Sequence, residues 1–243
     1  MRHLFSFLLA VTLLVAPALP AHAFRLVPIE MELEPSGRGA TQIFRVENDN
    51  KEPVAIEVKV VPRIMGMDGL DQESEQDTEN FVVFPEQIIL QPGENQSIRV
   101  QWVGSASPDR ELPFRLIAEQ LPIDIGKPAP QGGQVRLLVK YVASLYVVPP
   151  GVQPAVTVVS AQHRTLEEGP ALEVVLRNDG KARQVLREPT LTVQAGSSTL
   201  TLTRDQLGGL AGENLLAGTT RRFLVPWPAA LPAGPVTAKL ALL

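Results

Sequence analysis

A long run of strand-forming residues at positions 134–149 (QVRLLVKYVASLYVVP) constrains the fold of this chain more than any other stretch. The run is rich in β-branched and aromatic residues, contains no glycine and is followed by Pro150 and Gly151, which predicts a β-strand. At about 3.3 Å per residue it would extend on the order of 50 Å, several times the usual strand length. Apolar side chains occupy every odd position from 135 to 147: Val135, Leu137, Val139, Tyr141, Ala143, Leu145 and Val147.

The segment in front of this run, residues 126–133, contains three glycines and two prolines and cannot pair as a regular strand. Two interpretations of the long strand therefore stay open. It is either an ordinary buried core strand, or a strand whose first half lies at an exposed sheet edge. A soluble protein tolerates a long apolar edge only where that edge is meant to pair with another chain.

The N-terminus carries the pattern of a cleaved secretory signal. Arg2 and His3 precede an apolar run at residues 4–15, and Ala21-His22-Ala23 is a typical cleavage site. The apolar run is too short to span a bilayer, and no second run of membrane length follows. We therefore expect a signal peptide at residues 1–23 and no membrane insertion of the mature chain. Because an exported chain without cysteine holds its fold by packing alone, a bacterial periplasm is the expected compartment.

The charge of the mature chain argues against nucleic acid as a partner. Without Arg2 the chain has 21 lysines and arginines against 26 aspartates and glutamates, a formal net charge of −5. Binding to DNA or RNA requires a basic patch or stripe, and the composition offers no such footprint.

From Phe24 onward, short apolar-alternating segments are separated by Pro, Gly and Asn turns, and no helix of ordinary length is expected. The apolar residues at 54, 56, 58 and 60, for example, alternate with Glu57 and Lys59, as in a half-buried strand. The pattern restarts after Pro149 and Pro150. We expect an all-β protein with an immunoglobulin-like domain at 24–148 and a second, smaller one at 149–243, set at an angle with a cleft between them.

The residues needed for common catalytic chemistry are missing. Two of the three histidines leave with the signal, which isolates His163, and the chain has no thiol, nucleophile elbow, zinc motif or phosphate-binding loop. Residues 66–80 contain acidic side chains, but they lack the glycine placement and terminal glutamate of a calcium loop. This segment is interpreted as a solvated loop, and neither an enzyme nor a metal or other cofactor is expected. The acidic residues are Asp71, Glu73, Glu75, Asp77 and Glu79.

The ordered series of these segments resembles the periplasmic pilus chaperones of the chaperone–usher pathway, the PapD-like family. Besides the exported start, the resemblance rests on residues 26–33, 46–53, 84–100, 110–122, 132–137, 175–180 and 216–223. It implies two immunoglobulin-like domains arranged as a boomerang. It also implies that the long strand lends itself to an incomplete pilus subunit, which is called donor-strand complementation, before delivery to an outer-membrane usher. The resemblance leaves open whether the free chain caps itself as a homodimer.

By position, the residues that the family uses to fill the groove of the subunit fall on Val135, Leu137 and Val139, with Tyr141 as an extension. Better-known members hold the subunit's terminal carboxylate with an arginine on the first strand and a lysine late on the long strand. Here the corresponding neighbourhoods carry Glu30, Glu32 and Ser144. Lys140 and Arg115 are the candidate replacements, although Arg115 could equally be a solvated surface charge. This departure points to a divergent branch, nearer the archaic or alternative class.

Two other functions make different demands on the sequence. An exported glycan-binding protein or adhesin would normally stack sugars on exposed aromatic rings, but the mature chain has only Trp102, Trp227, Tyr141 and Tyr146 besides phenylalanines. A secreted glycoside hydrolase would need two carboxylates at a reactive separation in a cleft. The scarcity of tryptophan and tyrosine favours the chaperone.

Overall fold

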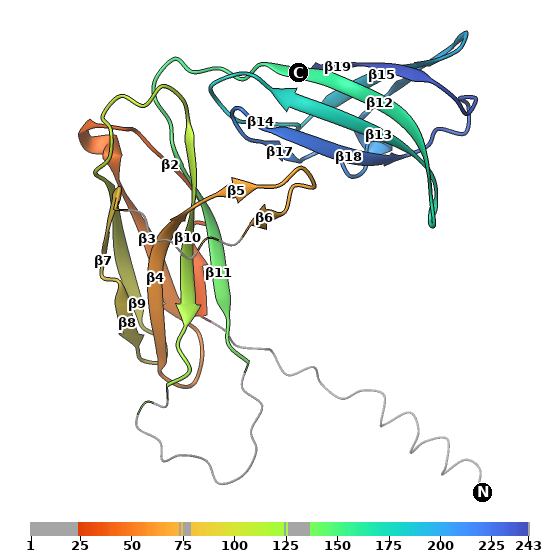
Figure 1. Ribbon diagram of the computed structural model, residues 1–243. Helices are drawn as coiled ribbons and strands as arrows, with labels where there is room; N and C mark the ends of the chain where they lie inside the picture. Colours follow the sequence, from red (N-terminus) through yellow and green to blue (C-terminus); the bar gives the residue numbers. More distant parts are fainter. Residues whose placement is uncertain (1–23, 73, 75–78, 124, 126–136, 243) are drawn as a thin grey trace, which may run out of the picture.

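The computed structural model describes residues 24–72, 74, 79–123, 125 and 137–242. The expected signal peptide, the whole glycine- and proline-rich segment 126–133, and Val135 lie outside these residues. The described chain folds into two β-sandwiches, one upright and one lying across its upper end in Figure 1. Apart from two short 3-10 helices, η1 (Gly37–Ala40) and η2 (Arg204–Gln206), its regular elements are strands. The all-β fold with two immunoglobulin-like sandwiches is confirmed.

The first sandwich contains two facing sheets. One has the order β1-β3-β9-β7 and consists of Phe24–Val27, Thr41–Asn48, Asn95–Trp102 and Phe81–Phe84. The other has the order β2-β11-β10-β4-β8 and consists of Glu30–Leu33, Lys140–Val147, Leu112–Gln120, Val54–Pro62 and Gln87–Leu90. All neighbours are antiparallel except β2 and β11, which run parallel. The chain thus changes sheets between β1 and β2, which places β2 beside the long strand.

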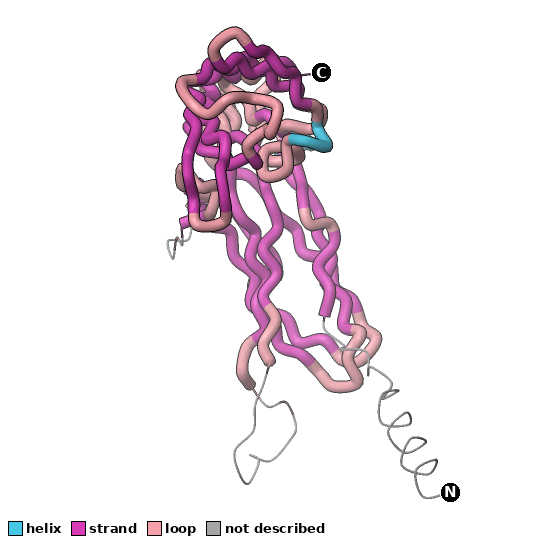
Figure 2. Tube along the Cα trace, turned by 90° about the vertical axis from the view of Figure 1, so that its right-hand side faces the viewer, coloured by secondary structure: helices cyan, strands magenta, loops and turns pink. Residues whose placement is uncertain are grey.

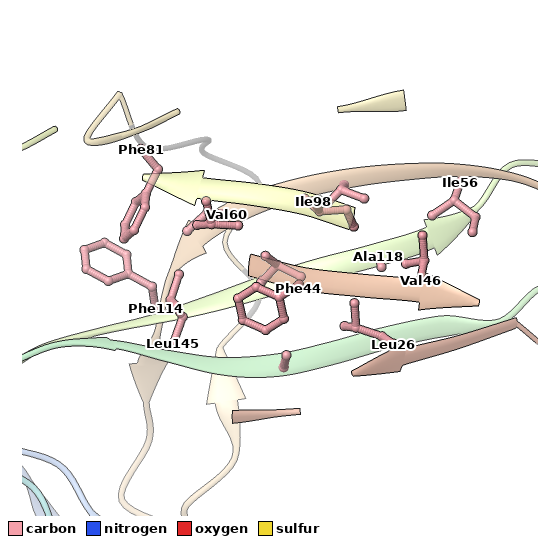
Figure 3. Packing of buried hydrophobic residues seen from close by; sticks show 14 of the residues in the cluster. Leu26, Phe44, Val46, Ile56, Val60, Phe81, Ile98, Phe114, Ala118 and Leu145 are labelled. Carbon is pink, nitrogen blue, oxygen red and sulfur yellow. The ribbon is translucent and has the colours of Figure 1, made fainter. Parts of the chain in front are cut away.

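The apolar alternation seen in the sequence fills the space between these sheets. Val54, Ile56, Val58 and Val60 of β4 are all buried, whereas Glu57 and Lys59 are partly exposed. Figure 3 shows the same cluster from close by, with aromatic and aliphatic side chains of both sheets facing one another. Phe81 lies edge-on against Phe114, with ring centroids 4.9 Å apart.

The second sandwich follows after Pro149, Pro150 and Gly151. One of its sheets has the order β12-β13-β18, consisting of Val156–Leu166, Gly169–Asn178 and Thr220–Pro226. The facing sheet has the order β16-β15-β19, consisting of Ser198–Leu202, Pro189–Ala195 and Val236–Leu242, and a small ladder joins β14 (Gln184–Val185) to β17 (Asn214–Leu215). Its core is separate from that of the first sandwich and includes Leu172, Val174, Leu176 and Phe223.

A short hairpin extends from the first sandwich toward the second. Its strands are β5 (Ile64–Met65) and β6 (Asp71–Gln72), which follow directly from β4. Figure 1 shows the hairpin reaching to the underside of the second sandwich, and Figure 2 shows the elongated first sandwich beneath it from the side. The sequence alone places residues 66–80, which include β6 and the turn of the hairpin, in a solvated loop, so the hairpin is a finding of the structure.

Each sandwich is fastened by one buried asparagine at the end of a strand. Asn48 donates from its amide nitrogen to the carbonyls of Glu52 and Leu90. Asn178 donates to the carbonyls of Ala182 and Leu215, at 2.8 and 3.2 Å. Its side-chain oxygen accepts the backbone N–H groups of Ala155 and Gly180, each at 3.0 Å. One polar side chain therefore satisfies four backbone groups of the turns around it.

Replacing Asn178 by alanine is expected to destabilise the second sandwich by roughly 2–4 kcal/mol, because buried backbone groups lose their partners. Urea unfolding followed by circular dichroism measures the change. Asn95→Ala is the control, since Asn95 is exposed at the start of β9 and should change stability by less than about 0.5 kcal/mol. Equal effects of the two substitutions would contradict the assigned role of Asn178.

Candidate functional site: a half-covered strand and an arginine pair

Strand β11 is covered on both sides along only half of its length. On one side β10 pairs with all of it, from Lys140 opposite Glu119 to Val147 opposite Leu112. On the other side β2 pairs only with residues 144–147, beginning at Ser144 opposite Glu30. Residues 140–143 therefore have no partner strand on that side among the described residues. The first half of β11 is a sheet edge, as one of the two interpretations of the sequence expects.

The backbone polar groups at this edge point away from β10. The carbonyl of Val139 accepts from the N–H of Gln120 at 3.0 Å, whereas the N–H of Ser144 donates to the carbonyl of Ile29 at 2.8 Å. Because alternate residues of a strand bond to the same neighbour, the odd residues bond to β10. Lys140 and Val142 consequently direct their N–H and C=O groups to the open side. Such a row of unpaired groups is a template for an added strand.

The strand is shorter than the sequence predicts. It begins at Lys140, and residues 137–139 belong to no regular element. The neighbour explains the difference, because β10 ends at Gln120 and is followed by Leu121 and Pro122. Proline cannot donate to a ladder, so Leu137 and Leu138, which precede the bond between Val139 and Gln120, have no strand to pair with in the described chain.

The four predicted groove-filling residues lie in different surroundings. Val135 is outside the described residues. The side chain of Leu137 is 82% exposed, whereas Val139 is partly buried and packs on the edge of the first core. Tyr141 lies edge-on against Phe24, with ring centroids 5.0 Å apart. By alternation Tyr141 belongs to the face that Ala143, Leu145 and Val147 bury farther along the strand.

An arginine pair lies beside the point where the open edge ends. Arg115, opposite Ser144 in the ladder, donates to the Ser144 hydroxyl and pairs through Nε with Oδ2 of Asp71 at 2.6 Å. Arg63 pairs through Nε with Oδ1 of the same carboxylate at 2.9 Å. The side chains of Arg63, Arg115 and Asp71 are 8%, 18% and 27% exposed. We call these three residues the arginine–aspartate cluster.

The two predicted anchor residues line one pocket but make different ion pairs. Lys140 and Arg115 both border a pocket of about 500 Å³ on the outer face of the sheet, together with Arg63 and Asp71. The Lys140 ammonium lies 3.9 Å from Oε2 of Glu119 and is nearly half exposed. Arg115, in contrast, belongs to the arginine–aspartate cluster. Lys140 is therefore near the cluster without being part of it.

A second set of charges joins the two sandwiches. Arg183, just before β14, pairs with Glu111 at 3.0 Å and with Glu32 at 2.5 Å, and its guanidinium lies 3.7 Å from the ring centroid of Tyr146. It also lies 3.5 Å from Glu30. The two acids that would repel a ligand carboxylate are thus engaged by an arginine of the second sandwich. The Tyr146 hydroxyl accepts from Arg63 at 2.8 Å and from Asn214 at 2.9 Å, which connects this set to the cluster.

Burial raises the pKa of Glu111 above its usual 4.5, and the nearby positive charge of Arg183 offsets this only in part. The folded protein therefore binds the Glu111 proton more tightly than the unfolded chain does. The stabilisation from this group is fully present below pH 4.5 and is lost as the pH rises through the raised pKa.

Glu111→Gln should consequently have a flatter dependence of melting temperature on pH than the wild type. Between pH 4.5 and neutral pH the wild type should lose stability relative to the variant, because glutamine stays neutral throughout. Thermal unfolding of both proteins at several pH values measures the difference. A constant difference between the two curves would argue against a raised pKa.

Within the described ranges, no three His, Asp or Glu side chains gather as a metal site. Among the same residues, no helix is long and apolar enough to cross a membrane.

The comparison with protein families is decisive. Residues 32–153, half of the chain, match the family model of the pili and flagellar-assembly chaperone, PapD N-terminal domain. The chain belongs to this chaperone family. Its members are pilus chaperones and not enzymes, which confirms the resemblance seen in the sequence and the expectation of a protein without catalysis.

Solved structures show the same fold over both sandwiches of this chaperone. The class 5 fimbriae chaperone CfaA is 17% identical, with a TM-score of 0.56, and the match covers 90% of this chain and 99% of that chain. A structure of the CsuC–CsuE chaperone–tip adhesion subunit pre-assembly complex, from the archaic chaperone–usher Csu pili of Acinetobacter baumannii, is 19% identical with a TM-score of 0.58. That match covers 90% of this chain and 97% of the other. No curated protein sequence matches the chain.

Several residues of the chaperone's site were missed by reasoning from sequence. Asp71 was placed in a solvated acidic loop, Arg63 was not singled out, and Arg183 had no assigned role. Glu73, Glu75 and Asp77 of the acidic loop lie outside the described residues. A sequence signal for Arg63 did exist, since it directly follows the Val54–Pro62 strand and so lies at the same end of the sheet as Ser144.

Proposed function

We propose that this chaperone works in the periplasm, binds pilus subunits by donor-strand complementation along β11, and passes them to an outer-membrane usher. The proposal includes export by a signal peptide at residues 1–23 and two domains at 24–148 and 149–243. The half-covered strand β11 carries the proposal, because its open edge combines unpaired backbone groups with exposed apolar residues. A subunit that lacks one strand has the complementary defect, an apolar groove with unpaired edges.

The energetics fit a reversible capture. A large apolar side chain that enters such a groove contributes about 1.5–3 kcal/mol before the costs of ordering. Val135, Leu137, Val139 and Tyr141 together offer roughly 6–12 kcal/mol of gross stabilisation on this scale. Val139 and Tyr141 already contact the chaperone's own core, so part of their contribution is present before binding. We propose Arg115, with Lys140 nearby, as the basic group that receives the subunit's terminal carboxylate.

A subunit with its missing strand restored provides the direct test. The chaperone is co-expressed in the periplasm with a pilus subunit, or with the same subunit extended by its own complementary strand. We expect the unmodified subunit to co-purify and the extended one to remain free. A stable complex with the extended subunit would indicate ordinary surface binding and overturn strand donation.

Purification of the free chaperone tests a self-capped homodimer, which would leave β11 inaccessible to subunits.

Val142→Pro is expected to weaken subunit binding about tenfold, which corresponds to the loss of roughly one backbone hydrogen bond. The N–H of Val142 faces the open edge, so its removal should spare the ladder with β10, and edge strands tolerate proline at such positions. Val142→Thr keeps the N–H and is the matched control. Equal binding by the two variants, measured by calorimetry with a pilus subunit, would exclude strand addition at this edge.

The surroundings of the aromatic residues give no support to glycan binding. Trp102 and Tyr146 are buried. Trp227 is partly buried, donates to the carbonyl of Leu231 and lies edge-on against His163. Tyr141 packs against Phe24. Among the described tryptophans and tyrosines, each ring is engaged by the protein itself.

A further inference from the structure

The Asp71 carboxylate lies between two arginine side chains. One of its oxygens faces Arg63 and the other faces Arg115, at 2.9 and 2.6 Å. Arginine presents its donors in a planar fork that matches a carboxylate. Two guanidinium groups around one carboxylate leave a surplus positive charge, so the cluster remains attractive to another anion.

The two arginines keep partners other than Asp71. Arg63 donates from Nη1 to the hydroxyl of Tyr146, and Arg115 donates to the hydroxyl of Ser144. Tyr146 and Ser144 both belong to β11, which is held by β10 and β2 at these positions. The guanidinium groups would therefore stay in place if Asp71 moved away.

Asp71 itself is on an element that can be displaced. The β5–β6 hairpin is short: its ladder pairs Ile64 with Gln72 and Met65 with Asp71, and the N–H of Gly66 donates to the carbonyl of Leu70. An isolated hairpin is marginally stable in water. Its apolar side chains face solvent in part, with Ile64 49%, Met67 51% and Leu70 69% exposed. The ion pairs of Asp71 with Arg63 and Arg115 therefore hold the second strand of the hairpin against the first sandwich.

The tip of the hairpin is attached to the second sandwich. The carbonyl of Met67 accepts the backbone N–H of Arg222 in β18 at 2.7 Å. Gly69, at a φ of 84°, lies so close to the Arg221 guanidinium that a Cβ there would be 1.8 Å from Nη2. Figure 1 shows the hairpin bridging the space between β4 and the strands β17 and β18. A movement of Asp71 would therefore disturb the contacts of the hairpin tip with β18.

The position of the cluster and its surplus positive charge fit the C-terminal end of a bound chain. Arg115 lies opposite Ser144, the first residue of β11 that β2 covers. A strand added along residues 140–143 in the direction of β2 would meet the start of β2 at this point and end there with its C-terminus. The group presented at a C-terminal strand end is the α-carboxylate, and the adjoining pocket of about 500 Å³ has room for its last side chain.

We propose that Asp71 is a built-in substitute for this carboxylate, and that a chain-terminal carboxylate displaces it from Arg63 and Arg115. The displaced hairpin then loosens its attachment to β18. Binding of a subunit to the first sandwich thereby changes a contact of the second sandwich. The identity of the ligand rests on the proposed function, whereas competition between Asp71 and a carboxylate can be tested separately.

The test uses the mature chaperone and a peptide copy of the C-terminal strand of a pilus subunit, made with a free carboxylate and with an amide. Asp71→Asn removes the competing charge and should increase affinity for the carboxylate peptide about tenfold, while affinity for the amide peptide stays unchanged. Asp68→Asn is the matched control, because Asp68 caps the N–H of Leu70 in the same hairpin without contacting the arginines. Lower or equal affinity of Asp71→Asn for the carboxylate peptide would overturn the proposal.

Hydrogen exchange on the unmodified protein gives a second measurement that does not depend on how a variant folds. Binding of the carboxylate peptide should increase exchange at the Arg222 amide, because its bond to Met67 opens, and the amide peptide should increase it less. Unchanged exchange would overturn the release of the hairpin. If neither peptide binds while whole subunits are still captured, competition at the cluster is wrong and strand donation stands. If subunits are not captured, the proposed function itself fails.

Discussion

Replacing Leu137 by glutamate is expected to abolish capture of pilus subunits while the chaperone stays folded. The side chain is 82% exposed, so the free protein loses little packing. In the complex, the variant would bring a carboxylate into an apolar groove, at a cost of several kcal/mol in addition to the lost burial of leucine. A loss of binding of at least about 100-fold corresponds to roughly 3 kcal/mol. Co-purification and calorimetry with a pilus subunit measure it.

Ile89→Glu is the matched control for this experiment. Ile89 is also exposed, at 57%, but it lies on β8, at the other edge of the same sheet. It should keep subunit binding close to the wild-type value. If Leu137→Glu binds as tightly as the control, residues before β11 do not enter the subunit, and strand donation in the proposed form is wrong.

Replacing Arg183 by alanine is expected to destabilise the protein more than any other single change considered. The side chain of Glu111 is 4% exposed, and its carboxylate pairs with Arg183. Removing the arginine would leave a buried charge without its partner, which typically costs about 3–5 kcal/mol. For a chain of this size, that corresponds to a fall in melting temperature of roughly 6–20 °C. Differential scanning calorimetry measures the shift.

A second substitution shows whether the unpaired, buried carboxylate of Glu111 causes this loss of stability. Adding Glu111→Gln to Arg183→Ala should recover a substantial part of the stability, because the buried group is then neutral. Arg187→Ala, which removes an exposed arginine four positions along the chain, is the control for the loss of a positive charge. If the double variant is as unstable as Arg183→Ala, the contact of Arg183 with the Tyr146 ring carries the effect instead.

The strands were predictable because their side chains obey a local rule. Alternation at residues 54–60 identified β4, and the restart after Pro149 identified the strands of the second sandwich, such as β19 at Val236–Leu242. The length of β11 could not be predicted in this way. A strand persists only where a neighbouring strand supplies hydrogen bonds. The length of β11 is therefore set by β10 and β2, and the apolar pattern of β11 itself does not reveal it.

The charged contacts could not be predicted from the sequence, for a related reason. Arg183 and Glu32 are 151 positions apart, and no periodic pattern links charges on two separate domains. Asp71 was misread because an acidic loop ordinarily lies in solvent, and nothing nearby in the sequence indicates that Arg115, 44 positions away, faces it. The chemistry of the candidate site therefore depended on the fold, although its apolar half was visible in the odd positions of the long strand.

The point at which β2 begins has a consequence for the size of what can be bound. Since Glu30 pairs with Ser144, a strand added along residues 140–143 could not extend past Ser144 while β2 stays in place. A polypeptide whose final residues overrun this stop would have to buckle or displace β2, whereas one that is too short would leave unpaired backbone behind. Discrimination among candidate cargo proteins would then depend on where each chain terminates as much as on its composition.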